Sequence, residues 1–198
     1  ERPRPAAPKG ALRPAWRDRA QREGADVKRW FGKPAPAPEI AVLMVCMGNI
    51  CRSPTAEAML RAKLAAAGLA ARVHVDSAGT HGYHVGDPPD ARAQRHARTR
   101  GVDLSALRAR RVVEGDFDRF DLVLAMDEDN LAELQRLGPA DHPNRPRLLL
   151  EFASRPPARE VPDPYFGGPE GFEHVLNLIE DACDGLVDHL RGRLEGAA

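Results

Sequence analysis

The sequence predicts an α/β fold, a four-stranded open parallel sheet with helices on both faces. Short apolar runs alternate with helix-like stretches from residue 40 onward, as in chains that cross repeatedly between strand and helix. The first run, IAVLMV (40–45), contains no polar residue, which is typical of a strand buried on both faces. The 198 residues, 42% of them hydrophobic, suffice for one full core.

Three further strands and four helices follow in order. The strands are predicted at RVHVDSAG (72–79), FDLVLAM (120–126) and RLLLEF (147–152). The helices are predicted at residues 54–69, 90–101, 127–138 and 171–194, and a proline-rich loop (156–169) precedes the last one. Gly101 and Gly138 stand where the second and third helices should end.

The chain divides into residues 1–38 and a domain at 39–195. The first 38 residues hold seven of the 18 prolines and ten Lys or Arg against four acids, a net +6 that the remainder cancels. This composition predicts a largely disordered basic extension, ending in a stiff linker, KPAPAPE (33–39). A basic anchor and an arm docked on the acidic remainder are the alternatives.

Charge and cysteine content limit the binding partners and the cellular compartment that the sequence predicts. Lys and Arg equal Asp and Glu at 29 each, so bulk charge gives no reason to expect a nucleic-acid or membrane partner. No apolar run approaches the roughly 18 residues of a membrane span. Three cysteines are too few for a disulfide framework and suggest a reducing compartment or catalytic use. We therefore expect a cytoplasmic protein.

The segment CMGNICRS (46–53) carries the chemistry. It follows the first strand, where open parallel sheets bind ligands. Gly48 and Asn49 allow left-handed backbone, so the loop can turn its N–H groups inward, with Ser53 as cap and Pro54 as first residue of the helix behind it. Arg52 adds a planar fork for two phosphate oxygens. In this positive field Cys46 should be a thiolate facing a bound phosphate, a nucleophile for phosphoryl transfer.

This segment resembles the signature of the low-molecular-weight protein tyrosine phosphatases. The resemblance extends over about residues 40–192 and includes DSAGTHGYHVGDPPDARA (76–93), AMDEDNL (125–131) and DPYFGG (163–168). It implies Cys46 as nucleophile, Arg52 as ligand of the phosphoryl oxygens and Asp163 as general acid, then base. It also implies a phosphate-binding loop whose members are Met47, Gly48, Asn49, Ile50, Cys51, Arg52 and Ser53.

The resemblance assigns further roles around this loop. Tyr83 and Tyr165 align with aromatics that line the family's phenyl slot. Asn49 and Ser77 align with residues that brace the loop, and Ser53 with the hydroxyl that helps the thiolate depart. One position differs: many members carry a hydrogen-bonding histidine after DLS, and Leu107 stands there. We expect no cofactor.

The substrate is expected to be a phosphotyrosine protein. Ile50 favours it, since tyrosine-directed members have a bulky aliphatic residue there and arginine-phosphatase relatives have threonine. Bacterial relatives often act on tyrosine kinases, which makes such a kinase a candidate partner. The sequence does not predict an oligomeric state. For Cys51 we hypothesise a redox role, capture of an oxidised Cys46 in a disulfide; a small buried packing residue is the alternative.

Three other functions remain as alternatives. An arsenate reductase-like enzyme of the same fold would need two further cysteines as a relay, and only the distant Cys183 lies beyond Cys51. A non-catalytic phosphopeptide-binding module would not need Cys46 and Asp163. A metal site from Cys46, Cys51, His81 and His84 fits poorly, because the arginine beside Cys51 would repel a cation, so we expect no metal.

Overall fold

The computed structural model describes residues 37–196 except 140, 141, 143, 155–157, 166 and 167. The predicted disorder of residues 1–36 lies outside this part of the chain. The elements in chain order are β1 (Ile40–Cys46), α2 (Arg52–Ala66), β2 (Val73–Gly79), α3 (Ala91–Arg98), the 3₁₀ helix η1 (Glu114–Asp116), β3 (Leu122–Ala125), α4 (Glu128–Leu137), β4 (Arg147–Leu148), the 3₁₀ helix η2 (Leu149–Phe152) and α5 (Pro169–Gly196).

The predicted parallel sheet is confirmed, with strand order β2-β1-β3-β4. The chain leaves β1 toward β2 on one side and later returns to pair β3 on the other. The strand order therefore reverses between β1 and β3. The crevice beyond the carboxyl ends of these two strands is where open α/β sheets bind ligands.

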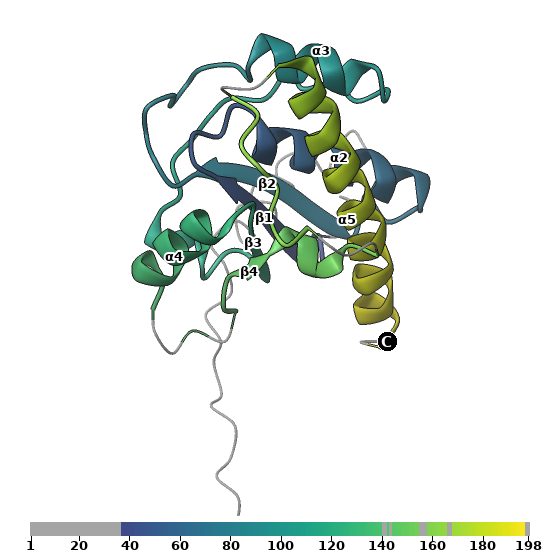
Figure 1. Cartoon of the computed structure of the whole chain (residues 1–198). Coiled ribbons are helices and arrows are strands. Elements are labelled where there is room, and N and C mark those ends of the chain that lie inside the picture. Colours follow the sequence, from purple (N-terminus) through teal and green to yellow (C-terminus); the bar gives the residue numbers. More distant parts are fainter. Residues whose placement is uncertain (1–36, 140–141, 143, 155–157, 166–167, 197–198) are drawn as a thin grey trace, which may run out of the picture. The chain divides into compact units, whose positions relative to one another are not determined.

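Helices cover both faces of the sheet, with α2 and α5 on one side and α4 on the other (Figure 1). Val42 and Met44 of β1 join a buried cluster with α2 and α5, including Leu60 and Ile179. Leu43 alternates with them, is fully buried and points to the opposite face. The strand is apolar throughout because both of its faces are covered.

The fourth strand is shorter than predicted. The apolar run 147–152 was expected to be one strand, but only Arg147–Leu148 pairs with β3, and Leu149–Phe152 forms η2. Glu151 Oε1 accepts the backbone N–H of Leu148 at 3.0 Å, which closes the turn. Leu149 and Leu150 are both buried, so an apolar run of this length does not distinguish a strand from a helical turn.

An aspartate side chain caps the N-terminus of both α3 and α4. Asp90 accepts the backbone N–H groups of Arg92 and Ala93 at the start of α3, and Asp127 accepts that of Asn130 at the start of α4. Helix α5 is longer than predicted, Pro169–Gly196 instead of 171–194. No helix in the described ranges is long and apolar enough to cross a membrane.

Candidate active site

Cys46 ends β1 and lies at the bottom of the loop 46–53, which leads into α2. Its side chain is 3% exposed. Its Sγ lies 3.1 Å from the hydroxyl oxygen of Ser53 and accepts the backbone N–H of Asn49 at 3.3 Å. The sulfur therefore lies at the N-terminus of α2, an end of a helix that attracts negative charge.

Ser53 does not cap α2, which corrects the expectation from the sequence. The helix begins at Arg52, and the residue before it, Cys51, makes no side-chain cap. The Ser53 hydroxyl is instead turned toward the sulfur of Cys46 and accepts Asn49 Nδ2 at 2.9 Å. The serine–proline pattern predicts a helix start, and α2 does begin nearby. The serine hydroxyl, however, contacts Cys46, seven residues earlier in the chain, and does not cap the helix.

Asn49 fixes the shape of the loop. It is 2% exposed and has a φ of 56°, a left-handed conformation that asparagine tolerates better than most residues. Its Nδ2 donates to the hydroxyls of Ser53 at 2.9 Å and Ser77 at 2.8 Å, and its Oδ1 accepts the backbone N–H of Arg110 at 2.9 Å. All the polar atoms of this buried amide are therefore satisfied.

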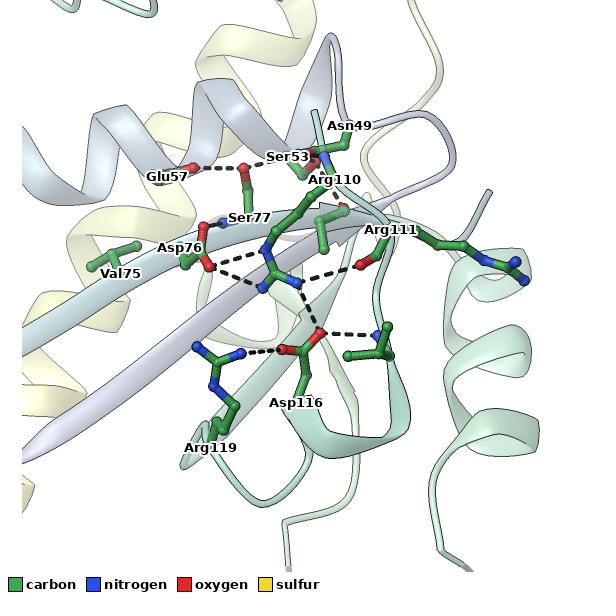
Figure 2. Close-up of polar contacts among 12 residues, drawn as sticks. Asn49, Ser53, Glu57, Val75, Asp76, Ser77, Arg110, Arg111, Asp116 and Arg119 are labelled. Carbon is green, nitrogen blue, oxygen red and sulfur yellow. Dashed lines mark hydrogen bonds and ion pairs between the residues drawn. The ribbon is translucent and has the colours of Figure 1, made fainter. Parts of the chain in front are cut away.

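A polar network beneath the loop holds these groups (Figure 2). The Ser77 hydroxyl donates to Glu57 Oε2 of α2 at 2.5 Å, and Glu57 Oε1 pairs with Arg61 at 2.7 Å. Burial raises the pKa of Glu57, an effect that the Ser77 hydrogen bond and the charge of Arg61 oppose without cancelling. The network thus ties the loop to both α2 and β2.

Arg110 anchors the segment that braces Asn49. Its guanidinium lies between two carboxylates, with Nε 3.1 Å from Asp76 Oδ2 and Nη1 2.9 Å from Asp116 Oδ2 (Figure 2). Leu107, which stands where many relatives have a histidine, is partly buried against the apolar core. The backbone N–H of Arg110 gives the loop a brace that requires no hydrogen bond from residue 107.

Arg52 is buried among carboxylates. Its Nη1 donates to Asp127 Oδ2 and to the carbonyl oxygen of Val161 at 3.1 Å, and its Nη2 donates to Asp163 Oδ2 at 3.1 Å. Burial alone would lower the pKa of Arg52, but the charges of Cys46, Asp127 and Asp163 outweigh burial and raise it, so the guanidinium stays charged. Three of its five donors are engaged in the described residues. Nε and the second Nη2 hydrogen remain for a ligand.

Asp163 lies in the segment 161–165, which runs past the mouth of the loop. Its side chain is 41% exposed. One carboxylate oxygen accepts Arg52, and the other accepts the backbone N–H of Tyr165 at 3.1 Å. The segment's first residue, Val161, donates its N–H to the carbonyl of Met126 at 2.8 Å, just beyond β3. A carboxyl that reaches solvent in this position can exchange a proton with a bound group.

One cavity brings most of the predicted site residues together. Its volume is about 180 Å³. Its lining includes Tyr83 and Tyr165, which are 77% and 39% exposed. The full lining consists of Cys46, Met47, Gly48, Ile50, Cys51, Arg52, Tyr83, His84, Asp163 and Tyr165. Asn49, Ser53 and Ser77 do not line it; all three are buried and hydrogen-bonded to Cys46 or to one another.

The other two cysteines differ in their surroundings. Cys51 lines the cavity and is 6% exposed; burial, followed by the charge of Asp90, raises the pKa of its thiol well above the usual range. Cys183 is fully buried in α5, with its Sγ 3.8 Å from the carbonyl oxygen of Ala56. All three cysteines are free. In the part of the chain described, no group of three or more His, Cys, Asp or Glu side chains is arranged to hold a metal ion.

Two contacts of the site were not assigned from the sequence. Asp127 pairs with Arg52 across 75 residues of chain, and His84 lines the cavity beside Gly48. The position of Asp127 immediately after a predicted strand was the available signal, because such residues reach the ligand edge of a parallel sheet. His84 had no such signal, since it lies in a loop without periodicity.

Comparison with known proteins agrees with this geometry. The profile of the low molecular weight phosphotyrosine protein phosphatase family matches residues 41–195. The low molecular weight protein-tyrosine-phosphatase YfkJ of Bacillus subtilis is 40% identical over 75% of this chain and 94% of its own length. A Streptomyces coelicolor enzyme described by the same words is 43% identical over 79% and 97%. A crystal structure of a protein tyrosine phosphatase from Entamoeba histolytica, with Hepes in its active site, superimposes with a TM-score of 0.75 at 38% identity, covering 80% of this chain and 99% of the other.

The fold, the cavity at the carboxyl end of β1 and these relatives together identify a phosphatase enzyme. More specifically, the chain belongs to the low molecular weight phosphotyrosine protein phosphatase family, because the family profile covers most of its length and several relatives exceed 30% identity over nearly their whole length.

Proposed function

We propose that this enzyme hydrolyses phosphotyrosine in proteins through a phosphocysteine intermediate. The observation that supports it best is the shared cavity: Cys46, Arg52 and Asp163 all line it, and Arg52 Nη2 lies 3.1 Å from the Asp163 carboxylate. A nucleophile, a phosphate ligand and a proton donor thus surround one space. This is the combination that in-line phosphoryl transfer to a protein side chain needs.

In the first step the Cys46 thiolate attacks phosphorus, an S–P bond forms and the P–O bond to the phenol breaks. Asp163, protonated, gives its proton to the departing phenolate oxygen. In the second step Asp163 takes a proton from water, whose oxygen attacks phosphorus, and the S–P bond breaks to return the thiolate. The Ser53 hydroxyl, 3.1 Å from Cys46 Sγ, stabilises the negative charge that returns to sulfur.

The phosphoryl oxygens would be held by Arg52 and by the backbone of the loop from Met47 to Ser53. Arg52 retains Nε and one Nη2 hydrogen for this purpose, beside its contacts within the described residues. A guanidinium presents two donors to two oxygens of one phosphoryl group. The helix N-terminus behind the loop adds a favourable field for the dianion.

Tyr83 and Tyr165 would hold the phenyl ring of the substrate. Both are exposed and line the cavity that contains Cys46. Ile50 lines the same cavity and favours a flat aromatic leaving group over the guanidinium of phosphoarginine. The substrate protein, for which a tyrosine kinase is a candidate, would be met in the cytoplasm, where the cysteines stay reduced.

The test is hydrolysis of p-nitrophenyl phosphate against pH by the parent, Cys46→Ser and Asp163→Ala proteins. The parent should be active, Cys46→Ser inactive, and Asp163→Ala slowed with a changed pH profile. Trapping of ³²P on the parent at low pH, absent in Cys46→Ser, would identify the intermediate. A folded parent that binds phosphate without hydrolysing the ester would contradict the mechanism and favour a binding module.

For Cys51 we propose protection of the nucleophile from oxidation. Peroxide converts the Cys46 thiolate to a sulfenic acid, and the Cys51 thiol condenses with it to a disulfide with loss of water. Because burial raises the pKa of Cys51, its thiolate is scarce, so the condensation should accelerate as pH rises. If Cys51→Ser recovers activity after peroxide and then thiol as fully as the parent, the protective role is wrong.

A further inference from the structure

Arg92 in the first turn of α3 is held in one orientation by Asp90. Its Nε donates to Asp90 Oδ1 at 3.1 Å and its Nη2 to Asp90 Oδ2 at 2.9 Å, a bidentate pair. Asp90 is fixed in turn, since its N–H donates to the carbonyl oxygen of Ile50 at 2.8 Å. The Arg92 guanidinium is therefore hydrogen-bonded to Asp90, which in turn is hydrogen-bonded to the backbone of the loop 46–53.

The rest of the guanidinium faces the segment 161–165. Arg92 Nη1 donates to the carbonyl oxygen of Tyr165 at 3.0 Å. Its Cζ lies 5.2 Å from the centroid of the Tyr165 ring and 5.0 Å from that of Phe172 in α5. These distances are within the range of cation–π attraction. A single side chain thus contacts Tyr165 through both its backbone and its ring.

The contact between Arg92 and Tyr165 also affects the position of Asp163, because a short turn joins Tyr165 to Asp163. The N–H of Tyr165 donates to Asp163 Oδ1, so a shift of Tyr165 moves the carboxyl as well. The other end of the segment is already fixed, because Val161 donates to Met126 and accepts Arg52. Arg92 adds a side-chain hydrogen bond at the Tyr165 end of the segment.

We propose that Arg92 is a positioning residue for the reaction: it ties Tyr165 to the loop 46–53 through Asp90, and so aims the Asp163 carboxyl at the departing phenolate oxygen. The proposal rests on the function proposed above for Asp163. A residue with this task affects proton transfer to the leaving group and leaves phosphate binding unchanged. That difference is measurable, since a phenolate that leaves readily needs little help from an acid.

The experiment measures kcat/KM for p-nitrophenyl phosphate, whose phenolate leaves readily, and for phenyl phosphate, whose phenolate does not. Arg92→Gln should lower kcat/KM for phenyl phosphate roughly tenfold or more, and that for p-nitrophenyl phosphate by about twofold at most. Arg92→Lys keeps the charge but lacks the planar fork, so it should behave like Arg92→Gln. The inhibition constant of inorganic phosphate should stay at the parent value in both variants.

Arg95→Gln is the matched control, because Arg95 is exposed on the same helix and its side chain makes no ion pair or hydrogen bond among the described residues. It should match the parent with both substrates. A double variant completes the design. In an Asp163→Ala background, Arg92→Gln should produce no further loss with phenyl phosphate, since the group that it positions is gone.

The outcomes separate this proposal from the proposed function. If Asp163→Ala fails to lower phenyl phosphate hydrolysis more than p-nitrophenyl phosphate hydrolysis, the acid role of Asp163 is wrong. If Asp163→Ala behaves as expected but Arg92→Gln lowers both substrates equally, or acts equally without Asp163, the positioning role alone is overturned. Full recovery in Arg92→Lys would also overturn it, since charge would then suffice.

Discussion

Gly79, the last residue of β2, is a position where the site leaves no room for a side chain. A Cβ built there would lie 2.7 Å from the carbonyl oxygen of Met47, 3.0 Å from that of His81 and 3.1 Å from the carbonyl carbon of Gly48. All three atoms are backbone, and two belong to the loop 46–53. The loop can therefore occupy its position only because residue 79 has no Cβ.

Gly79→Ala should destabilise the protein by about 1–3 kcal/mol, because the added methyl group displaces backbone in a packed region. It should also lower kcat/KM, since the displaced backbone carries the loop. Urea unfolding and p-nitrophenyl phosphate hydrolysis measure the two effects. The control is Gly115→Ala, where a Cβ would meet no atom within 4 Å in the described structure. Equal effects of the two substitutions would contradict this account.

Glu57 makes stability depend on pH. Because burial raises its pKa in the folded state, the folded protein binds this proton more tightly than the unfolded chain does. The stability due to this group is fully present below its ordinary pKa of 4.5 and is lost as pH rises through the raised value. Glutamine removes this titration and keeps an amide oxygen for the Ser77 hydroxyl.

The parent should therefore lose stability relative to Glu57→Gln as pH rises from about 4.5 toward neutrality, as urea unfolding at several pH values will show. Glu173→Gln provides a control of opposite sign. A hydrogen bond from His96 lowers the pKa of Glu173, so its contribution is present above the ordinary value and is lost as pH falls. A difference between the parent and Glu57→Gln that does not change with pH would contradict the first expectation.

At the scale of elements, α5 packs against η2 at one point without a side chain between them. A Cβ on Gly185 would lie 1.9 Å from the carbonyl oxygen of Phe152, whereas one on Gly192 would meet no described atom within 4 Å. Both glycines are in the same helix. Alanine at Gly185 therefore tests close packing, whereas alanine at Gly192 tests helix propensity alone.

Gly185→Ala should destabilise the protein by about 1–3 kcal/mol or more, since helix and 3₁₀ turn must separate. Gly192→Ala should stabilise it by about 0.5–1 kcal/mol, because alanine is the better helix former and has room. Denaturation midpoints of the two variants and the parent test both expectations. The reverse order would mean that α5 and η2 are not in contact in solution.

The elements show how far the sequence predicts this molecule. Strand β1 and its neighbours were predictable because burial on both faces leaves only apolar residues. The boundary between β4 and η2 was not, because Leu149 and Leu150 are buried in either conformation. Of the residues that line the cavity, those of the contiguous loop 46–53 and of the DPY segment (163–165) could be named from the sequence. The pairs Arg52–Asp127 and Arg92–Tyr165 join positions more than 70 residues apart and depend on tertiary structure.

At the scale of the whole molecule, the catalytic unit is contained in one part of the chain. Residues Pro38–Ala198 form one compact unit, and the family profile begins at residue 41. The site residues, the network beneath the loop and the apolar core described above all belong to it. The unit therefore carries its own core and its own site, as expected of an independent domain.

Deletion of residues 1–37 should leave kcat/KM for p-nitrophenyl phosphate within about twofold of the full chain, and the thermal midpoint nearly unchanged. Both proteins should be compared at equal concentration and ionic strength. A loss of activity beyond about tenfold would mean that the basic extension contributes to the site. A change seen only with a phosphoprotein substrate would instead assign the extension to substrate recognition.

The pairing of Arg52 with both Asp127 and Asp163 has a consequence for inhibition. In the free enzyme the side chains of Asp127 and Asp163 already contact the Arg52 guanidinium beside the cavity, so an incoming oxyanion must share it with them. Sulfate or phosphate has no aromatic ring to offset this competition, whereas we expect an aryl phosphonate to gain contacts from Tyr83 and Tyr165, which line the same cavity. Small oxyanions should therefore be weak inhibitors, and the enzyme should clear its own product readily.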